Sequence, residues 1–449
     1  MKSLASLVCA CFLLGCSALP TEPQQTEAPA PLPTSQPSYS APAVQPSANE
    51  RLAISKQLDS LANASSVQKD KPTAFQPGIR TVDLTAAQSD LWLRMRKGFA
   101  MPDLLSPTVD RQVQLLLANR QGLLTMLERG RPYLHHILDE LEKRGMPSEL
   151  ALLPVVESAF NPHALSSASA AGLWQFIPST GKVFQLRQNW WVDERRDVLA
   201  STTAALQYLQ TTYEMHGDWH LALASYNWGE NAVARAIKAN QSAGRPTDFN
   251  SLRMPAETSQ YVPKLQAIKQ IVSFPEQYAI KLPEIPNQPY FMKVERSQAM
   301  DVALAAKLAE ISLADFRLLN PAYNRPVIPG DHNADLLLPI ENAQKFQLNL
   351  AIYNGPLLSW KTYTLPRRER VEDVARRLNL SAETLRTANG LKAGARLAVG
   401  YTLLIPGNVN TEARTAATGK PTPKTGRPIS GKTDTAQPRV ADSTRQPRG

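Results

Sequence analysis

Glu157 is the residue of this sequence best placed for acid–base chemistry. It comes near the end of an apolar helical stretch, and Asn161-Pro162 ends that helix directly afterwards. Its nearest neighbours are apolar: Val155, Val156, Ala159 and Phe160. Poor solvation raises the pKa of a carboxyl, which would let Glu157 stay protonated near neutral pH and act as a general acid. The alternative, and the usual state of a lone glutamate at a helix end, is a solvated residue without catalytic function.

Four separated sequence blocks favour the catalytic interpretation over that alternative. They are, in order, ESAFNPHALSSASAAGLWQF, STTAALQYL, SYNWGE and QYVPK. Together they resemble the lytic transglycosylase domain of lysozyme-like fold. With the preceding segments DLWLRMRKGF and LEKRGMPSELALLPVVES, the likeness covers about residues 88 to 406 and extends to the family of membrane-bound lytic murein transglycosylase D.

The resemblance implies that Glu157 is the single catalytic acid and base acting on peptidoglycan glycan strands. It would protonate the glycosidic oxygen between N-acetylmuramic acid and N-acetylglucosamine. It would then take the proton of the muramic acid's C6 hydroxyl, which closes on C1 to give a 1,6-anhydro product. Ordinary glycosidases need two carboxyls about 5 to 9.5 Å apart, but here the substrate supplies the nucleophile. Glu149 is a poor partner, because helix rise places it roughly 12 Å before Glu157.

Two other functions stay open at this point. A hydrolytic muramidase on the same fold would need a second carboxyl, and four candidates cannot be placed from the sequence: Asp193, Asp197, Asp218 and Glu230. A non-catalytic peptidoglycan-binding lipoprotein would keep the fold only as a docking surface. The presence of Glu157, Gln175 and Tyr226-Asn227 argues against the binder.

The resemblance also implies a set of substrate-binding residues. Gln175 offers an amide to sugar hydroxyl or acetamido groups. Tyr226 and Asn227 match the family's Ala-Tyr-Asn-x-Gly block near the catalytic glutamate, and Tyr261 matches its late cleft tyrosine. Ser158, beside the acid, is expected to support the helix end and is counted with them. Five tryptophans offer faces for sugar stacking, although core packing is the usual state of most: Trp174, Trp190, Trp191, Trp219 and Trp228.

Neither a metal nor an organic cofactor is indicated by the sequence. All three cysteines lie in the first sixteen residues, and His135-His136 has no third ligand nearby, so a structural role is expected for both histidines. The formal net charge of +10 invites a nucleic-acid interpretation, but the tail from Glu412 alone carries eight Lys and Arg against three acidic residues. In an exported protein such a tail would meet anionic cell wall or lipid headgroups rather than nucleic acid, or is simply solvated.

The N-terminal residues predict export and a lipid anchor. After Lys2 the run SLASLVCACFLLGC is too short to span a bilayer and is typical of a secretory signal. Leu13-Leu14-Gly15-Cys16 resembles a bacterial lipobox, in which the cysteine is acylated after cleavage; an ordinary signal peptide is the alternative. Ser17 after the cysteine resembles the outer-membrane sorting pattern. The expected location is the periplasmic face of the outer membrane.

Composition, periodicity and the resemblances to known families together divide the chain into seven predicted parts. They are a lipoprotein signal peptide (1–15), a disordered tether (16–50), an N-terminal helical region (51–146), the catalytic domain (147–275), a degenerate LysM-like module (288–340), a LysM-like module (361–406) and a basic disordered tail (408–449). In the helical part, Gly130-Arg131-Pro132 is expected to separate two helices. Ser148 is expected to cap the next helix and Pro154 to kink it.

The C-terminal part contains an internal repeat. ISLADFRLLNPAY aligns with LSAETLRTANGL, so that Ser312 matches Ser381. At the same offset Asn320 matches Asn389. Each copy resembles a LysM module, a strand-helix-helix-strand unit that binds glycans containing N-acetylglucosamine, although the second has Arg-Glu-Arg at 368–370 where Gly-Asp-Thr is usual. The expected fold is mainly α, with a lysozyme-like helical catalytic domain and two small α+β LysM-like modules.

Overall fold

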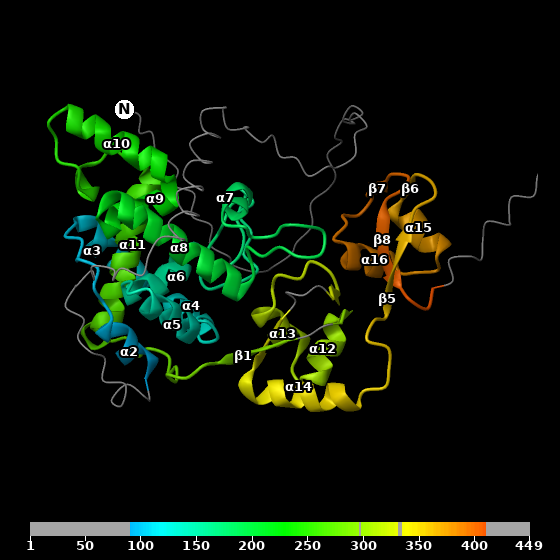
Figure 1. Ribbon diagram of the computed structural model, residues 1–449. Helices are drawn as coiled ribbons and strands as arrows, with labels where there is room; N and C mark the ends of the chain where they lie inside the picture. The colour runs from blue at the N-terminus through cyan, green and yellow to red at the C-terminus, as the bar shows by residue number, and fades with distance from the viewer. Residues whose placement is uncertain (1–89, 296–297, 331–334, 410–449) are drawn as a thin grey trace, which may run out of the picture. The chain divides into compact units, whose positions relative to one another are not determined.

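A computed structural model describes residues 90–295, 298–330 and 335–409 of the chain (Figure 1). The predicted signal peptide, Cys16, the tether, the first part of the predicted N-terminal helical region (51–89) and nearly all of the basic tail lie outside the described residues. Within them the chain is mainly helical, with short antiparallel strand pairs confined to its C-terminal half, which confirms the expected mainly α class. No helix of the described ranges is both long and apolar enough to cross a bilayer.

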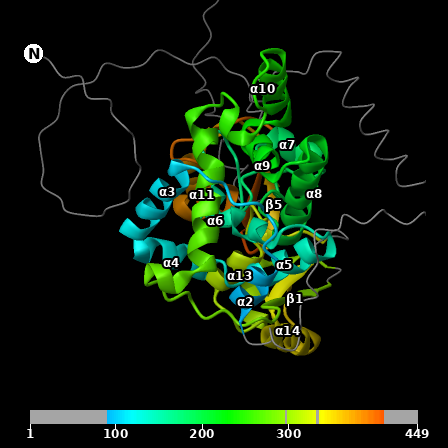
Figure 2. The same cartoon turned by 90° about the vertical axis from the view of Figure 1, so that its left-hand side faces the viewer.

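The region from Asp90 to about Ile285 is built from helices and short 3₁₀ turns. In chain order they are α2 (Leu91–Lys97), α3 (Pro107–Ala118), α4 (Arg120–Arg129), α5 (Leu134–Lys143), η1 (Ser148–Leu152), α6 (Leu153–Ser158), α7 (Pro178–Val183), α8 (Val198–His216), α9 (Trp219–Trp228), α10 (Glu230–Ser242), η2 (Phe249–Ser251), α11 (Ala256–Ser273) and η3 (Pro275–Tyr278). Helix α11 packs against α3, α9 and α6, as the turned view of Figure 2 shows.

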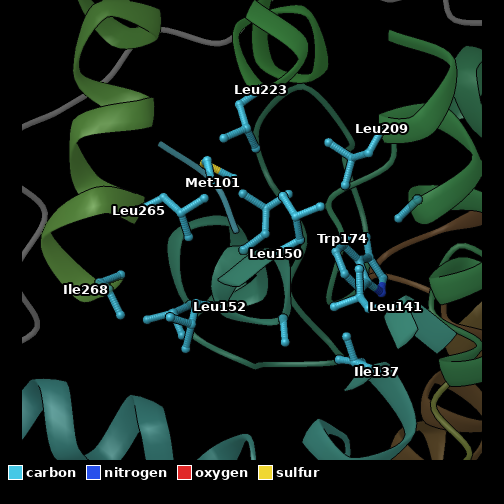
Figure 3. Close-up of a cluster of buried hydrophobic side chains, with 14 of the residues drawn as sticks. Met101, Ile137, Leu141, Leu150, Leu152, Trp174, Leu209, Leu223, Leu265 and Ile268 are labelled. Carbon is cyan, nitrogen blue, oxygen red and sulfur yellow. The ribbon is translucent and has the colours of Figure 1, made fainter. Parts of the chain in front are cut away.

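One hydrophobic core serves this whole region. Leu150 and Leu152 of η1 lie near the centre of Figure 3, surrounded by side chains from several helices. These neighbours are Ile137 and Leu141 of α5, Leu209 of α8, Leu223 of α9, and Leu265 and Ile268 of α11. The boundary expected between residues 146 and 147 therefore falls inside a shared core, since buried side chains from both sides of it belong to the same cluster.

The segment leading to Glu157 differs from the single kinked helix that was expected. Residues Ser148–Leu152 form a 3₁₀ turn, and α6 begins at Leu153 with Pro154 in its first turn. Proline fits there because its missing N–H would have no helical partner and its φ suits a helix start. The prediction of Ser148 as an N-cap is wrong, because its hydroxyl donates to the Met95 carbonyl at 2.6 Å instead.

Two helical stretches contain breaks that periodicity did not indicate. The expected break at Gly130 is confirmed, but Asn119 also ends α3, and its side chain caps α4 by accepting a hydrogen bond from the Gly122 N–H at 3.0 Å. Gly229, with φ of 91°, separates α9 from α10. Both breaks use residues that tolerate backbone angles outside the helical region.

Two small modules follow, and their strand-helix-helix-strand order is confirmed. The first contains β1 (Phe291–Val294), β2 (Met300–Asp301), α12 (Val302–Leu308), α13 (Leu313–Leu319), β3 (Val327–Ile328) and β4 (Leu336–Pro339), and α14 (Ile340–Ile352) continues from it. The second contains β5 (Trp360–Thr364), β6 (Glu369–Arg370), α15 (Val371–Arg377), α16 (Ala382–Asn389), β7 (Arg396–Leu397) and β8 (Thr402–Pro406). In each module the outer strands pair antiparallel, β1 with β4 and β5 with β8.

The predicted repeat is visible in two hydrogen-bonding arrangements. Ser312 and Ser381 each accept a hydrogen bond as the N-cap of a helix. Asn320 accepts from the Leu337 N–H at 2.9 Å and donates to the Leu337 carbonyl, and Asn389 does the same with Leu404. Because each asparagine ties the end of a helix to the last strand, the matched residues mark equivalent structural positions.

Candidate active site

Glu157 lies in the last turn of α6, where the chain leaves the helix abruptly. Ala159 and Phe160 both have left-handed backbone angles, with φ of 52° and 54°. Phe160 is buried and stacks on the Tyr133 ring, with 6.3 Å between ring centroids, which anchors this turn in the core. The helix end therefore holds the Glu157 carboxyl half-buried rather than fully solvated.

The hydroxyl of Tyr261 donates a hydrogen bond to Oε1 of Glu157. Tyr261 belongs to α11 and is buried. Burial raises the pKa of Glu157 to about 7, although the Tyr261 hydrogen bond and Lys264 favour the charged form. Glu257, in the first turn of α11, adds a smaller rise because it carries a like charge. The acid is thus balanced between its two protonation states near neutral pH.

Three of the predicted site residues meet at a turn formed by residues 164–176. Ser158 donates to the Leu173 carbonyl at 2.9 Å, and Tyr226 donates to the Trp174 carbonyl at 2.8 Å. Gln175, with φ of 49°, donates through Nε2 to the Gly172 carbonyl at 2.8 Å. These donors are used within the protein, so contacts from these three side chains to a substrate would come through oxygen acceptors.

An arginine that the sequence analysis missed holds this turn. The Arg195 guanidinium donates to the carbonyls of Ser169 at 2.6 Å and Phe176 at 3.1 Å. It is buried and also pairs with both carboxylate oxygens of Asp193, at 2.9 and 2.7 Å. The paired carboxylate fixes the guanidinium, which in turn joins the two arms of the turn.

Asn227, near the end of α9, is the last of the predicted site residues. Its Oδ1 accepts a hydrogen bond from the hydroxyl of Thr258, at 2.8 Å. Thr258 and Tyr261 are three residues apart on α11, so both project from the same face of that helix. No local sequence signal predicts the contact of Thr258 with Asn227 or those of Arg195 with Ser169 and Phe176, because these partners lie far away in the chain.

The other carboxyls considered as partners for Glu157 each form hydrogen bonds or ion pairs with other groups of the protein. Asp197 caps α8 and Asp218 caps α9, each accepting backbone N–H bonds. Glu230 accepts a hydrogen bond from Tyr208 at 2.7 Å. Glu149 is fully buried and accepts from the backbone N–H groups of Ala100 and Met101, at 3.0 and 2.7 Å. With Asp193 paired to Arg195, the carboxyl that acts on the Glu157 pKa is Glu257.

The tryptophans and the His135-His136 pair that the sequence singled out show no catalytic arrangement in the described residues. Trp174 and Trp219 are buried in the core, whereas Trp190, Trp191 and Trp228 are half-buried. The His135 and His136 side chains lie against Asp139 and the Phe291 ring, respectively. Within the described ranges, no three His, Cys, Asp or Glu side chains are grouped as a metal ion would require.

Comparison with family models gives the same assignment for two parts of the chain. Residues 137–249 match the family model described as transglycosylase SLT domain. Residues 290–354 match the model described as lytic transglycosylase MltD, LysM-like domain. These matches confirm the lysozyme-like domain and the first LysM-like module, which extends past the predicted end at residue 340 to include all of α14.

Individual relatives extend the likeness to more of the chain. Membrane-bound lytic murein transglycosylase D of Escherichia coli is 36% identical over 332 residues, which cover 71% of this chain and 73% of the relative. Membrane-bound lytic murein transglycosylase C of Serratia proteamaculans is 30% identical over 129 residues, covering 26% of this chain and 36% of that protein. The chain belongs to the family of membrane-bound lytic murein transglycosylase D.

Proposed function

We propose that Glu157 is the single general acid and base with which this lytic murein transglycosylase cleaves peptidoglycan. The observation that carries the proposal is the half-buried Glu157 carboxyl, with a pKa of about 7 and the Tyr261 hydroxyl on Oε1. A carboxyl in this state can both give up a proton and take one back near neutral pH. The assignment to peptidoglycan follows from the family.

The proposed reaction needs no second protein carboxyl and no water. Protonated Glu157 gives its proton to the oxygen that links C1 of N-acetylmuramic acid to N-acetylglucosamine, and the C1–O bond breaks. The resulting carboxylate takes the proton of the muramic acid's C6 hydroxyl. The C6 oxygen then bonds to C1, which yields a 1,6-anhydro end and restores protonated Glu157. Tyr261 stabilises the carboxylate between the two proton transfers, because an O–H donor favours the charged form.

A hydrolytic muramidase is the second candidate. It is favoured by the presence of a second carboxyl, that of Glu257, close enough to influence the Glu157 pKa. This carboxyl is exposed, lies one helical turn from Tyr261 and acts electrostatically on Glu157. A second carboxyl near the acid could activate water in place of the substrate hydroxyl. Glu257 also shares α11 with the exposed Lys264, whose opposite charge offsets its influence on the acid.

The mass of the released fragments distinguishes the two reactions. Purified sacculi digested with the wild-type protein should release muropeptides one water lighter than hydrolysed ones. Glu157→Gln should slow release by at least about a hundredfold, the usual contribution of a general acid, while circular dichroism stays unchanged. A folded Glu157→Gln protein that still cleaves at the wild-type rate contradicts the proposal.

Glu257→Gln is the matched control in the same digestion. If Glu157 acts alone, this variant still releases anhydro muropeptides, at a rate within about threefold of wild type. Hydrolysed products from the wild type, together with their loss in Glu257→Gln, would instead establish the hydrolytic reaction. A protein that only binds the cell wall would release neither kind of fragment.

We also propose that Cys16 carries a lipid that holds the protein on the periplasmic face of the outer membrane. Support comes from the lipobox-like sequence Leu13-Leu14-Gly15-Cys16 and from a family whose members are named as membrane-bound. Cys16→Ser should move the protein from the outer-membrane fraction to the soluble periplasmic fraction. Unchanged membrane association of that variant would exclude lipidation as the anchor.

A further inference from the structure

Two arginines lie opposite each other in the second LysM-like module. Its short strands β6 and β7 run side by side in Figure 1, and their register pairs Arg370 with Arg396. Directly opposite residues of an antiparallel pair project from the same face, with Cβ atoms roughly 5 Å apart. Both side chains are exposed. Like charges in these positions destabilise the strand pair, so the arrangement costs the module stability rather than adding to it.

The internal repeat shows that the fold does not require arginine at these positions. The offset that aligns the two copies places Asp301 and Val327 of the first module at the equivalent sites, opposite each other in β2 and β3. Both are buried there, at 7% and 5% exposed, and Asp301 accepts a hydrogen bond from the Ser359 N–H at 2.9 Å. The same strand pairing therefore forms with an acidic and an apolar residue, and of the two modules only the second has the arginine pair.

The acidic residues of the second module do not neutralise this pair. Residues 361–406 contain four of them. Glu369 lies next to Arg370 in the chain, but it pairs with Arg377 at 2.7 Å and with Arg367. The others pair with arginines of α15 and α16: Asp373 with Arg376, and both Glu372 and Glu383 with Arg386. All four carboxylates are thus already engaged by other arginines.

Two more cations flank the arginine pair and complete a basic patch. Arg368 precedes Arg370 by two residues. Lys392 precedes Arg396 by four, and its carbonyl accepts from the Ala395 N–H at 3.3 Å, so a tight turn keeps it near β7. The basic patch is therefore Arg368, Arg370, Lys392 and Arg396, all of them exposed. Within the described residues these four side chains make no hydrogen bond or ion pair, which leaves their donors to an anionic ligand.

We propose that the basic patch binds the free carboxylates of peptidoglycan peptide stems. A guanidinium holds a carboxylate through two parallel hydrogen bonds, so two neighbouring arginines can hold an anionic peptide firmly. In intact peptidoglycan the sugars are uncharged, because the lactyl carboxyl of muramic acid is bound in an amide, and the carboxylates belong to the peptides. The ligand is thus the peptide part of the polymer on which this family acts. No residue of the patch belongs to the candidate active site, so the inference does not depend on the role of Glu157.

Sedimentation with two forms of peptidoglycan tests the proposal. The first form is intact sacculi, and the second is sacculi whose free carboxyls have been converted to uncharged methylamides. The parent protein is the full chain with Glu157→Gln, kept on ice to limit cleavage. Adding Arg370→Gln and Arg396→Gln should weaken binding to intact sacculi at least about tenfold, the effect of lost hydrogen bonds to a charged group. Binding to methylamidated sacculi should stay as in the parent, because the patch has no carboxylate to hold there.

The matched control is Arg376→Gln with Arg386→Gln. It removes the same number of charges from the same module, but from arginines that already pair with acidic residues. Its binding to intact sacculi should stay within about threefold of the parent, since exposed ion pairs contribute little. Arg396→Val is a second patch variant, with the residue that the first module has at the equivalent site, and it keeps the test decisive if the glutamine variant does not fold.

The proposal is overturned if the patch variants bind intact sacculi as the parent does, if they lose binding to both forms equally, or if the control loses as much. Vesicles containing phosphatidylglycerol are a further arm of the test. Weaker binding to these vesicles without weaker binding to intact sacculi would assign the patch to lipid phosphates and overturn the proposal as well. The basic tail is the same in every variant, so it does not contribute to the differences. Cleavage by Glu157→Gln would reject the proposed function and leave this comparison standing.

Discussion

Glu157 is subject to two opposing influences, of which burial is the larger. Removal from water raises its pKa, because a charged carboxylate is poorly solvated among apolar neighbours. The Tyr261 hydroxyl lowers the pKa, because its O–H stabilises the carboxylate. A group that must act first as an acid and then as a base benefits when neither form is strongly preferred, and a pKa of about 7 meets that requirement.

Tyr261→Phe should therefore shift the pH dependence of cleavage. Only protonated Glu157 can start the reaction, so kcat/KM in the wild type should fall as pH rises through about 7. Loss of the Tyr261 hydrogen bond removes a group that favours the carboxylate, so the pKa of Glu157 rises. The falling limb should move to higher pH, while the maximal rate decreases about tenfold or more because the carboxylate intermediate loses its donor. Rates of muropeptide release across the pH range measure both effects.

Tyr278→Phe is the control for that profile. Tyr278 lies beyond the C-terminal end of α11 and accepts a hydrogen bond from Gln270, at 2.8 Å. Its substitution removes a tyrosine hydroxyl that is bonded to Gln270 and not to Glu157. The pH at which kcat/KM falls should therefore stay as in the wild type. A limb that moves to lower pH in Tyr261→Phe, or does not move, contradicts the role given to Tyr261.

At the scale of elements, the turn of residues 164–176 contains three residues with unusual backbone angles. Ser169, Gly172 and Gln175 have φ of 61°, 85° and 49°, all in the left-handed region. Such angles cost free energy for residues other than glycine and persist only where surrounding contacts impose them. Arg195 and the hydroxyls of Ser158 and Tyr226 supply those contacts. The turn is thus a shared support for several site residues.

Gly172→Ala should disrupt this support. An added Cβ would lie 2.2 Å from the Arg195 carbonyl oxygen, at a φ that alanine also disfavours. We expect a loss of about 2 to 4 kcal/mol in the free energy of unfolding and at least a tenfold lower cleavage rate. Gly217→Ala is the control, because Gly217 has φ of 67° but an open site for Cβ. It should cost only about 1 kcal/mol. Denaturant unfolding and sacculus digestion measure the difference, and equal effects would contradict the importance of the turn.

Elements with local signals were predicted from the sequence, and those that depend on distant contacts were not. The break at Gly130 and the equivalence of Ser312 and Ser381 follow from local residue patterns, and the structure shows that both serines are N-caps. The Arg195 contact to Ser169 spans 26 residues, and the contact of Thr258 to Asn227 spans 31. Nothing in the residue types alone selects these partners, because they meet only when the helices pack. Substrate contacts from Ser158, Gln175 and Tyr226 stay predictions.

At the scale of the whole molecule, the described residues form three hydrophobic clusters. The helical region has one, and each LysM-like module has its own. The first module is not independent, since Leu319 and Leu337 belong to the cluster of the helical region. In addition, the Tyr133 hydroxyl donates to the Leu318 carbonyl at 2.9 Å. The cluster of the second module shares no residue with the other two.

Two truncations should therefore have different consequences. A chain ending at Ser359 loses the second module and the basic tail, and it should keep the melting temperature of the helical region and the cleavage rate on soluble glycan strands. A chain ending at Asn287 also loses Leu319 and Leu337, and burial of two leucines contributes about 3 kcal/mol or more, so its melting temperature should fall by several degrees. Calorimetry compares them, and equal melting temperatures would show that the first module does not stabilise the helical region. A chain ending at Val409 lacks nearly all of the basic tail but keeps the second module. If the chain ending at Ser359 sediments less with sacculi than the chain ending at Val409, the second module contributes peptidoglycan binding, and linkage to a catalytic domain strengthens binding by such a small module.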